Sequence, residues 1–135
     1  MNTESYSMSL RLRHPTESVE SLVLDIGVSP IILQSLGEQR QTLSGTLLEG
    51  VYEQSYCNYN LARRKPGYFV DELEQWIVRL EDFRDIFSKI KRENGRIDIY
   101  VGVFVESTGG FMLSSKAMIS LGSLGIDLDV EYYAG

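Results

Sequence analysis

The sequence predicts an α+β fold: a ferredoxin-like, mainly antiparallel sheet with helices packed on one face. Three observations support this. Residues 6–13 and 126–132, near the two ends of the chain, alternate polar and apolar side chains as strands do. Residues 96–105 place five β-branched side chains on one face, which predicts an interior strand. Residues 70–92 carry one apolar stripe at helical spacing, as a helix packed on a sheet requires. The 135 residues suit a single domain spanning 1–135.

The N-terminal third is predicted to hold a strand and a helix. In the strand at 6–13, Arg11 and Arg13 lie on the polar face. Residues 16–27 repeat apolar side chains every three or four positions, which predicts a helix capped by Thr16 and ended by Gly27.

The middle of the chain is predicted to be less regular. Residues 37–42 are polar and lack periodicity, which indicates a loop that ends near Gly50. The tyrosine-rich residues 51–61 are typical of a strand, and the basic residues 63–67 of a turn. In the helical pattern that follows at 70–92, Asp82 could cap a second helix and so break the first.

The C-terminal third is predicted to contain a hairpin, a helix and a strand. Residues 107–110 read as a turn into a short strand at 111–113. Ser114 caps a helix that Gly125 ends, and the strand at 126–132 has one acidic face. This helix and the one at 16–27 have equal length and each follows a strand, which allows two interpretations: two strand-helix pseudo-repeats within the sheet, or a chance coincidence, since helices that end at glycine are common.

Composition excludes several classes of function. Thirteen basic and nineteen acidic residues give a net charge of −6, which disfavours nucleic acid as a partner. A single cysteine, Cys57, and a single histidine, His14, are too few for a disulfide, a Cys/His zinc site or a Cys-His catalytic pair. We therefore expect no cofactor and no metal, and we interpret Cys57 as a buried thiol and His14 as a loop residue. With no signal-like or membrane-spanning stretch in the sequence, we expect a cytoplasmic protein that binds no membrane.

Short segments along nearly the whole chain resemble one bacterial family. They are Ser9–Arg13 with His14-Pro15, Ile26–Pro30, Gly37-x-x-Arg40, the basic and tyrosine-rich middle, and Leu121–Tyr132. Together they resemble the domain of unknown function DUF4279. Members of that family often carry tryptophan where this chain has Tyr56. The family has no established activity, so the resemblance implies no catalytic residue.

The acidic strand face allows two interpretations. Asp127, Asp129 and Glu131 are residues that bind hard cations, but side chains two apart on a strand lie roughly 7 Å from one another, too far for one ion to gather all three readily. We favour pairing of these acids with Arg11 and Arg13 across adjacent strands, which requires the first and last strands to be neighbours.

One cluster is a candidate binding surface. Its members are Glu38, Arg40, Tyr52, Tyr56, Tyr59, Arg63 and Arg64, with Lys65 beside them. Tyrosine and arginine are enriched at protein interfaces, which favours recognition of another protein. The alternative is that the tyrosines are half-buried in the sheet and the basic residues form a solvated turn.

Two functions remain open at this point. The first is a non-enzymatic protein-binding module, regulatory or immunity-type, whose acidic character suits a basic partner. The second is a small-ligand-binding domain or minor enzyme with a pocket beside residues 37–50, where Arg40 holds an anion and Glu38 acts as acid or base. Either is compatible with a homodimer formed through a sheet edge or face.

Overall fold

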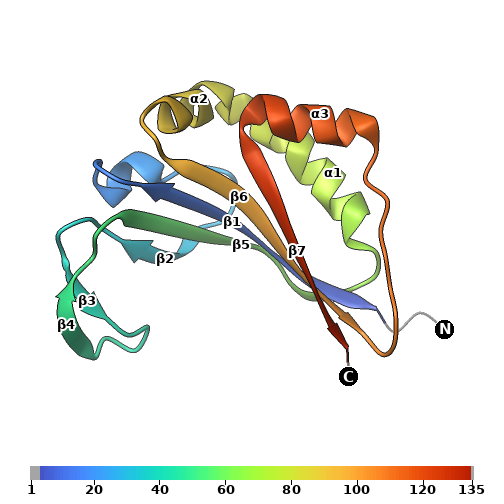
Figure 1. Cartoon of the computed structure of the whole chain (residues 1–135), viewed down its shortest axis with the longest axis horizontal. Helices are drawn as coiled ribbons and strands as arrows, with labels where there is room; N and C mark the ends of the chain where they lie inside the picture. Colours follow the sequence, from blue (N-terminus) through green and yellow to red (C-terminus); the bar gives the residue numbers. More distant parts are fainter. Residues whose placement is uncertain (1–3, 135) are drawn as a thin grey trace.

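Within residues 4–134, which the computed structural model describes, five strands form one mixed sheet with all three α-helices on the same face (Figure 1). The strands are β1 (Ser5–His14), β2 (Pro30–Gln34), β5 (Ser55–Pro66), β6 (Arg96–Val105) and β7 (Ile126–Ala134), in the order β2-β5-β1-β6-β7. The helices are α1 (Phe69–Leu80), α2 (Arg84–Arg92) and α3 (Ser115–Leu124). The α+β class and the single helical face are confirmed.

The core lies between the helices and the sheet. Every second residue of β1 is buried and its neighbours are half-buried, as strand alternation predicts. The apolar stripe of α1 packs onto this face through Leu73, Trp76, Ile77 and Leu80, all at most 5% exposed. The opposite face of the sheet carries no helix in the described part of the chain.

The C-terminal unit follows the prediction. The Ser114 side chain accepts a hydrogen bond from the Ala117 amide at 3.1 Å and so caps α3. Gly125 ends the helix in the left-handed conformation, at φ +74°. The chain then returns as β7 beside β6, and this pair is parallel while β1 runs antiparallel to both β5 and β6.

The predicted helix at 16–27 is wrong. Only a 3₁₀ turn, η1 (Val19–Leu22), forms there, and the chain then extends so that Leu24 and Ile26 are buried in alternation. Because no helix follows β1, the two strand-helix pseudo-repeats do not exist. The ferredoxin-like topology is not confirmed, since β6 lies between the first and last strands.

Three other predictions of local structure are corrected. Residues 37–42 are not a loop: β3 (Gln39–Gln41) pairs with β4 (Leu47–Val51) in a separate hairpin. The basic residues 63–66 belong to β5 rather than to a turn. Residues 107–113 form no strand and lead directly to α3. A break does occur near Asp82, because the 3₁₀ turn η2 (Glu81–Phe83) separates α1 from α2. The predicted cap is wrong, since the N-cap position of α2 is Phe83 and no side chain caps it.

The carboxylate of Glu72 joins three elements at one end of the core. It accepts hydrogen bonds from the Tyr6 hydroxyl of β1 at 2.7 Å, the Lys65 ammonium of β5 at 3.0 Å and the Trp76 indole of α1 at 3.1 Å. Partial burial acts to raise the pKa of Glu72, but these three donors outweigh it and hold the pKa below its usual value.

Replacing Glu72 with glutamine should lower the free energy of unfolding by about 1 to 3 kcal/mol at neutral pH, since the bonds to a charged acceptor are weakened. The lowered pKa means that Glu72 stabilises the fold fully above its ordinary pKa of 4.5 and loses that contribution as the pH falls through the folded-state value. Urea unfolding at several pH values should show the difference between wild type and Glu72→Gln shrinking on acidification. Glu74→Gln, at an exposed position of the same helix, is the control; a difference independent of pH would contradict the assignment.

Candidate functional site

The sheet face opposite the helices is polar and carries paired charges. Arg11 makes a bidentate contact with Asp98 of β6, at 2.8 and 2.6 Å, and its guanidinium lies 4.9 Å from the centre of the Tyr100 ring. It also reaches Asp129 of β7 at 3.2 Å. The predicted ion pair between Arg11 and Asp129 forms, but the expected adjacency of the first and last strands is wrong, because β6 lies between them. Asp98 of β6 is the nearer partner of Arg11, and Arg13 also contacts Asp98 rather than an acid of β7.

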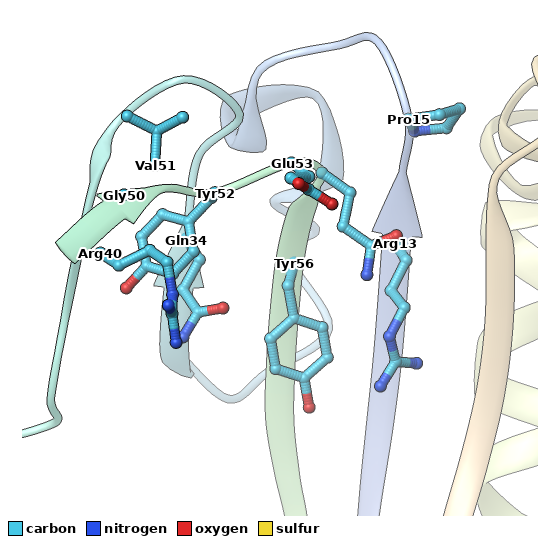
Figure 2. Close-up of a pocket in the computed structure, with 10 residues that line it drawn as sticks. Arg13, Pro15, Gln34, Arg40, Gly50, Val51, Tyr52, Glu53 and Tyr56 are labelled. Carbon is cyan, nitrogen blue, oxygen red and sulfur yellow. The ribbon is translucent and has the colours of Figure 1, made fainter. Parts of the chain in front are cut away.

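A cleft of about 980 Å³ opens at one end of this face. The β3–β4 hairpin leaves the sheet after β2 and extends to the side away from the helices (Figure 1). The cleft lies between the hairpin and the ends of β1 and β5 (Figure 2). Its lining residues are Arg13, Pro15, Gln34, Arg40, Gly50, Val51, Tyr52, Glu53, Gln54 and Tyr56.

Pairing between strands positions the residues on the sheet side of the cleft. Tyr56 of β5 is in register with both Arg13 of β1 and Gln34 of β2, so the three side chains share one row of the open face. The Arg13 guanidinium lies over the Tyr56 ring, 4.7 Å from its centre. The Asn58 amide, 9% exposed, donates to the Tyr56 hydroxyl at 2.8 Å and holds the ring in place.

Contacts within the hairpin position the other wall. The Tyr52 hydroxyl accepts from the Gln41 amide at 3.2 Å and donates to the Gln41 carbonyl at 3.3 Å. The Arg40 guanidinium donates to the Glu49 carbonyl at 3.3 Å and forms no ion pair with any described carboxylate. In Figure 2, Tyr56 lies between Arg13 on one side and Arg40 with Gln34 on the other.

The residues that line the cleft carry a net positive charge, although the protein as a whole is acidic. Two arginines and one glutamate, Glu53, line it, although the chain as a whole has a net charge of −6. The nearest carboxylate contact of Arg13 is with Asp98 at 4.0 Å, the limit of an ion pair, so its charge is weakly compensated. Such an arrangement attracts a carboxylate or another anion.

The structure separates the residues predicted as one cluster. Arg40, Tyr52 and Tyr56 line the cleft, whereas Glu38 is exposed on the hairpin and does not line it. Tyr59 is fully buried on the helical side of the sheet.

The basic residues of the cluster lie elsewhere. Arg63 and Arg64 are exposed beyond the middle of β5, where the Arg64 guanidinium stacks on Phe104 at 3.5 Å. Lys65 pairs with Glu72. None of the three lines the cleft.

The predicted cluster lacks four polar residues that line the cleft: Arg13, Gln34, Glu53 and Gln54. A signal was available for Arg13, because alternation already placed it on the polar face of its strand. Its partnership with Tyr56 depends on the register between β1 and β5, which alternation alone does not determine.

His14 and Cys57 are both buried, and both ring nitrogens of His14 have polar partners. The Nδ1 atom of His14 accepts from the amides of Thr16 and Glu17 at 3.1 and 3.0 Å, and its Nε2 atom lies 3.0 Å from Glu93. The expectation that His14 is a loop residue is wrong. His14 is only 1% exposed, is the last residue of β1, and stabilises the turn that follows through its hydrogen bonds. Burial raises the pKa of the Cys57 thiol, which makes it a poor nucleophile.

Residues 4–134 contain neither a cluster of metal-ligating side chains nor a helix that could span a membrane. Among residues 4–134, no three Asp, Glu, His or Cys side chains lie close enough together to hold a metal ion. Over the same range, no helix is both long and apolar enough to cross a bilayer.

Comparison with known proteins identifies a family but no individual related protein. No curated protein and no solved structure gives a significant match to this chain. A family model does match, over residues 4–135, and it covers every element that builds the sheet, the hairpin and the cleft. The chain therefore belongs to the family described as domain of unknown function (DUF4279).

Proposed function

We propose that this domain is a non-enzymatic binding module that holds an acidic segment of a partner protein in the cleft between the β3–β4 hairpin and the open sheet face. The observation that carries the proposal is the pair of weakly compensated arginines, Arg13 and Arg40, beside Tyr52 and Tyr56. Arginine and tyrosine combine directional hydrogen bonds with large contact area, which is why they anchor protein interfaces.

The hairpin supports a protein partner rather than a small molecule. All of its residues from 39 to 51 are exposed, and its aliphatic side chains include Leu43, Leu47 and Val51 at 84, 63 and 52% exposure. A two-stranded hairpin is marginally stable by itself, and apolar side chains beside a polar cleft are the composition of a protein interface. A partner that fills the cleft would cover these side chains as well.

The local charge changes the expected chemistry of the partner. Net charge favours a basic partner, but the groups that line the cleft favour carboxylates, and short-range contacts decide what binds there. A protein that binds a partner in this way could act as a regulator or as an immunity-type inhibitor, and we propose a role of this kind. Binding rather than catalysis is supported by His14, whose Nδ1 atom is already occupied by two amides.

A peptide display selection against the purified domain tests the proposal. We expect enrichment of segments that combine Asp or Glu with apolar residues, and about tenfold weaker binding of the enriched peptide to Arg40→Gln, or about 1.4 kcal/mol. Arg63→Gln, an exposed arginine outside the cleft, is the matched control and should bind as wild type does. Selection of basic or charge-free peptides, or equal binding by Arg40→Gln, would overturn the proposal. Binding of citrate with no peptide enrichment would favour the small-ligand alternative.

A further inference from the structure

We propose that the free edge of β2 pairs antiparallel with β2 of a second copy of this chain, which joins two five-stranded sheets into one continuous sheet. The inference concerns the sheet edge and is independent of what the cleft binds. It rests on a difference between the two edges of the sheet, β2 and β7.

The β7 edge is protected against self-association. Asp127, Asp129 and Glu131 are exposed along it on one face. Antiparallel pairing of two such strands would place carboxylates opposite carboxylates, which is destabilising. Charged residues of this kind are a common way in which proteins prevent pairing at an edge strand.

The β2 edge has no charged side chain that would oppose pairing; it is short and its register with β5 is irregular between Pro30 and Ile32. Its sequence, Pro30–Gln34, contains no charged residue. Ile31 and Leu33 are 60 and 52% exposed. An exposed, apolar and uncharged edge strand is a template for pairing with another strand.

The pattern of β2 is also self-complementary. The two-fold register centred on Ile32 places Ile31 opposite the partner's Leu33 and Ile32 opposite its own copy. Both are aliphatic cross-strand pairs, and no like charges meet. Pro30 lies opposite Gln34 and, having no amide hydrogen, donates no ladder hydrogen bond. The two-fold axis is perpendicular to the sheet, so the helices of both copies lie on one side and both clefts open on the other.

A five-residue strand pair buries little area, so we expect a dimer of micromolar affinity rather than an obligate one. Sedimentation velocity over the micromolar range should show a concentration-dependent dimer. Leu33→Lys should weaken it by about tenfold or more, because the lysine replaces an aliphatic partner at the paired edge. Ile119→Lys, at an exposed position on α3, is the control for added charge.

A cysteine crosslink tests the register. In Ile32→Cys the two introduced thiols would be directly opposite one another, with Cβ atoms about 5 Å apart, within reach of a disulfide after small adjustment. The native Cys57 is buried, so we expect it to form no crosslink between copies. We expect Ile32→Cys to form covalent dimers on mild oxidation about tenfold faster than Ile119→Cys, whose side chain is 71% exposed on a helix. A wild-type protein that stays monomeric throughout the range, or equal crosslinking of the two variants, would overturn the proposal.

Discussion

Replacing Gly95 with alanine is expected to lower the free energy of unfolding by about 3 kcal/mol, the upper range for overpacking a filled site. Gly95 lies between α2 and β6, and its amide donates to the Ile90 carbonyl at 2.8 Å. A Cβ atom there would overlap the Ile90 side chain and lie 2.7 Å from the Arg13 carbonyl oxygen and 2.9 Å from that of Ile90. Two of these three neighbours are backbone atoms held in β1 and α2, so they cannot move aside as a flexible side chain could.

The same substitution at Gly122 is the matched control. Gly122 is an exposed position in α3, and a Cβ atom there would meet nothing within 4 Å. Alanine is favoured over glycine in a helix by about 1 kcal/mol, so Gly122→Ala should stabilise the fold slightly. Urea unfolding of the two variants should therefore give changes of opposite sign. A Gly95→Ala protein as stable as wild type would show that α2 and β6 can separate at low cost.

The parts of the fold that sequence predicts correctly are those with local signals. The helix α3 has a capping serine at Ser114 and a left-handed glycine at Gly125, and both behave as expected. Apolar side chains alternate along residues 6–13 of β1 and along β6, and the structure buries the expected faces, except that Val105 at the end of β6 is half-buried. Each of these signals lies within the element that it specifies.

The parts that it predicts wrongly depend on distant contacts. Apolar residues from Val19 to Ile26 fit helical spacing, but backbone groups of Leu22 and Leu24 bond to the hydroxyl of Tyr59, more than thirty residues away, and the chain after η1 is extended. The hairpin at 39–51 has no apolar periodicity, because nothing in the described chain covers it. Neither feature can be recognised from a local window of sequence.

The sequence predicts only part of the candidate site, because the face of β5 that lines the cleft also depends on distant contacts. Alternation along β5 places Tyr56 and Tyr59 on opposite faces, because they are an odd number of residues apart. Alternation does not indicate which face the helices cover, so the sequence cannot separate Tyr56 from Tyr59 as candidate partners of Arg40. The structure places Tyr56 in the cleft and Tyr59 in the core.

Removing the Tyr59 side chain should therefore act on stability and not on a binding surface. Tyr59→Ala is expected to cost about 3 to 5 kcal/mol, as for other fully buried aromatic residues. Its hydroxyl accepts from the Leu24 amide and donates to the Leu22 carbonyl at 3.2 Å, and burial raises the pKa of this phenol above its ordinary value of 10.0. Tyr59→Phe removes the hydroxyl and keeps the ring. It should lower the free energy of unfolding by about 1 to 3 kcal/mol, because it leaves a buried amide without a partner.

Tyr52→Phe gives the contrast that distinguishes a structural tyrosine from a site tyrosine. The Tyr52 hydroxyl also bonds to backbone atoms, those of Gln41, but on an exposed hairpin where water can replace it. Its loss should change the free energy of unfolding by less than about 0.5 kcal/mol while weakening binding in the cleft. Thermal unfolding and peptide binding should both be measured on Tyr59→Phe and Tyr52→Phe. We expect Tyr59→Phe to lower stability, and Tyr52→Phe to weaken binding with little change in stability. Equal destabilisation by the two substitutions would mean that the hairpin is packed as firmly as the core, and the case for a partner covering it would fail.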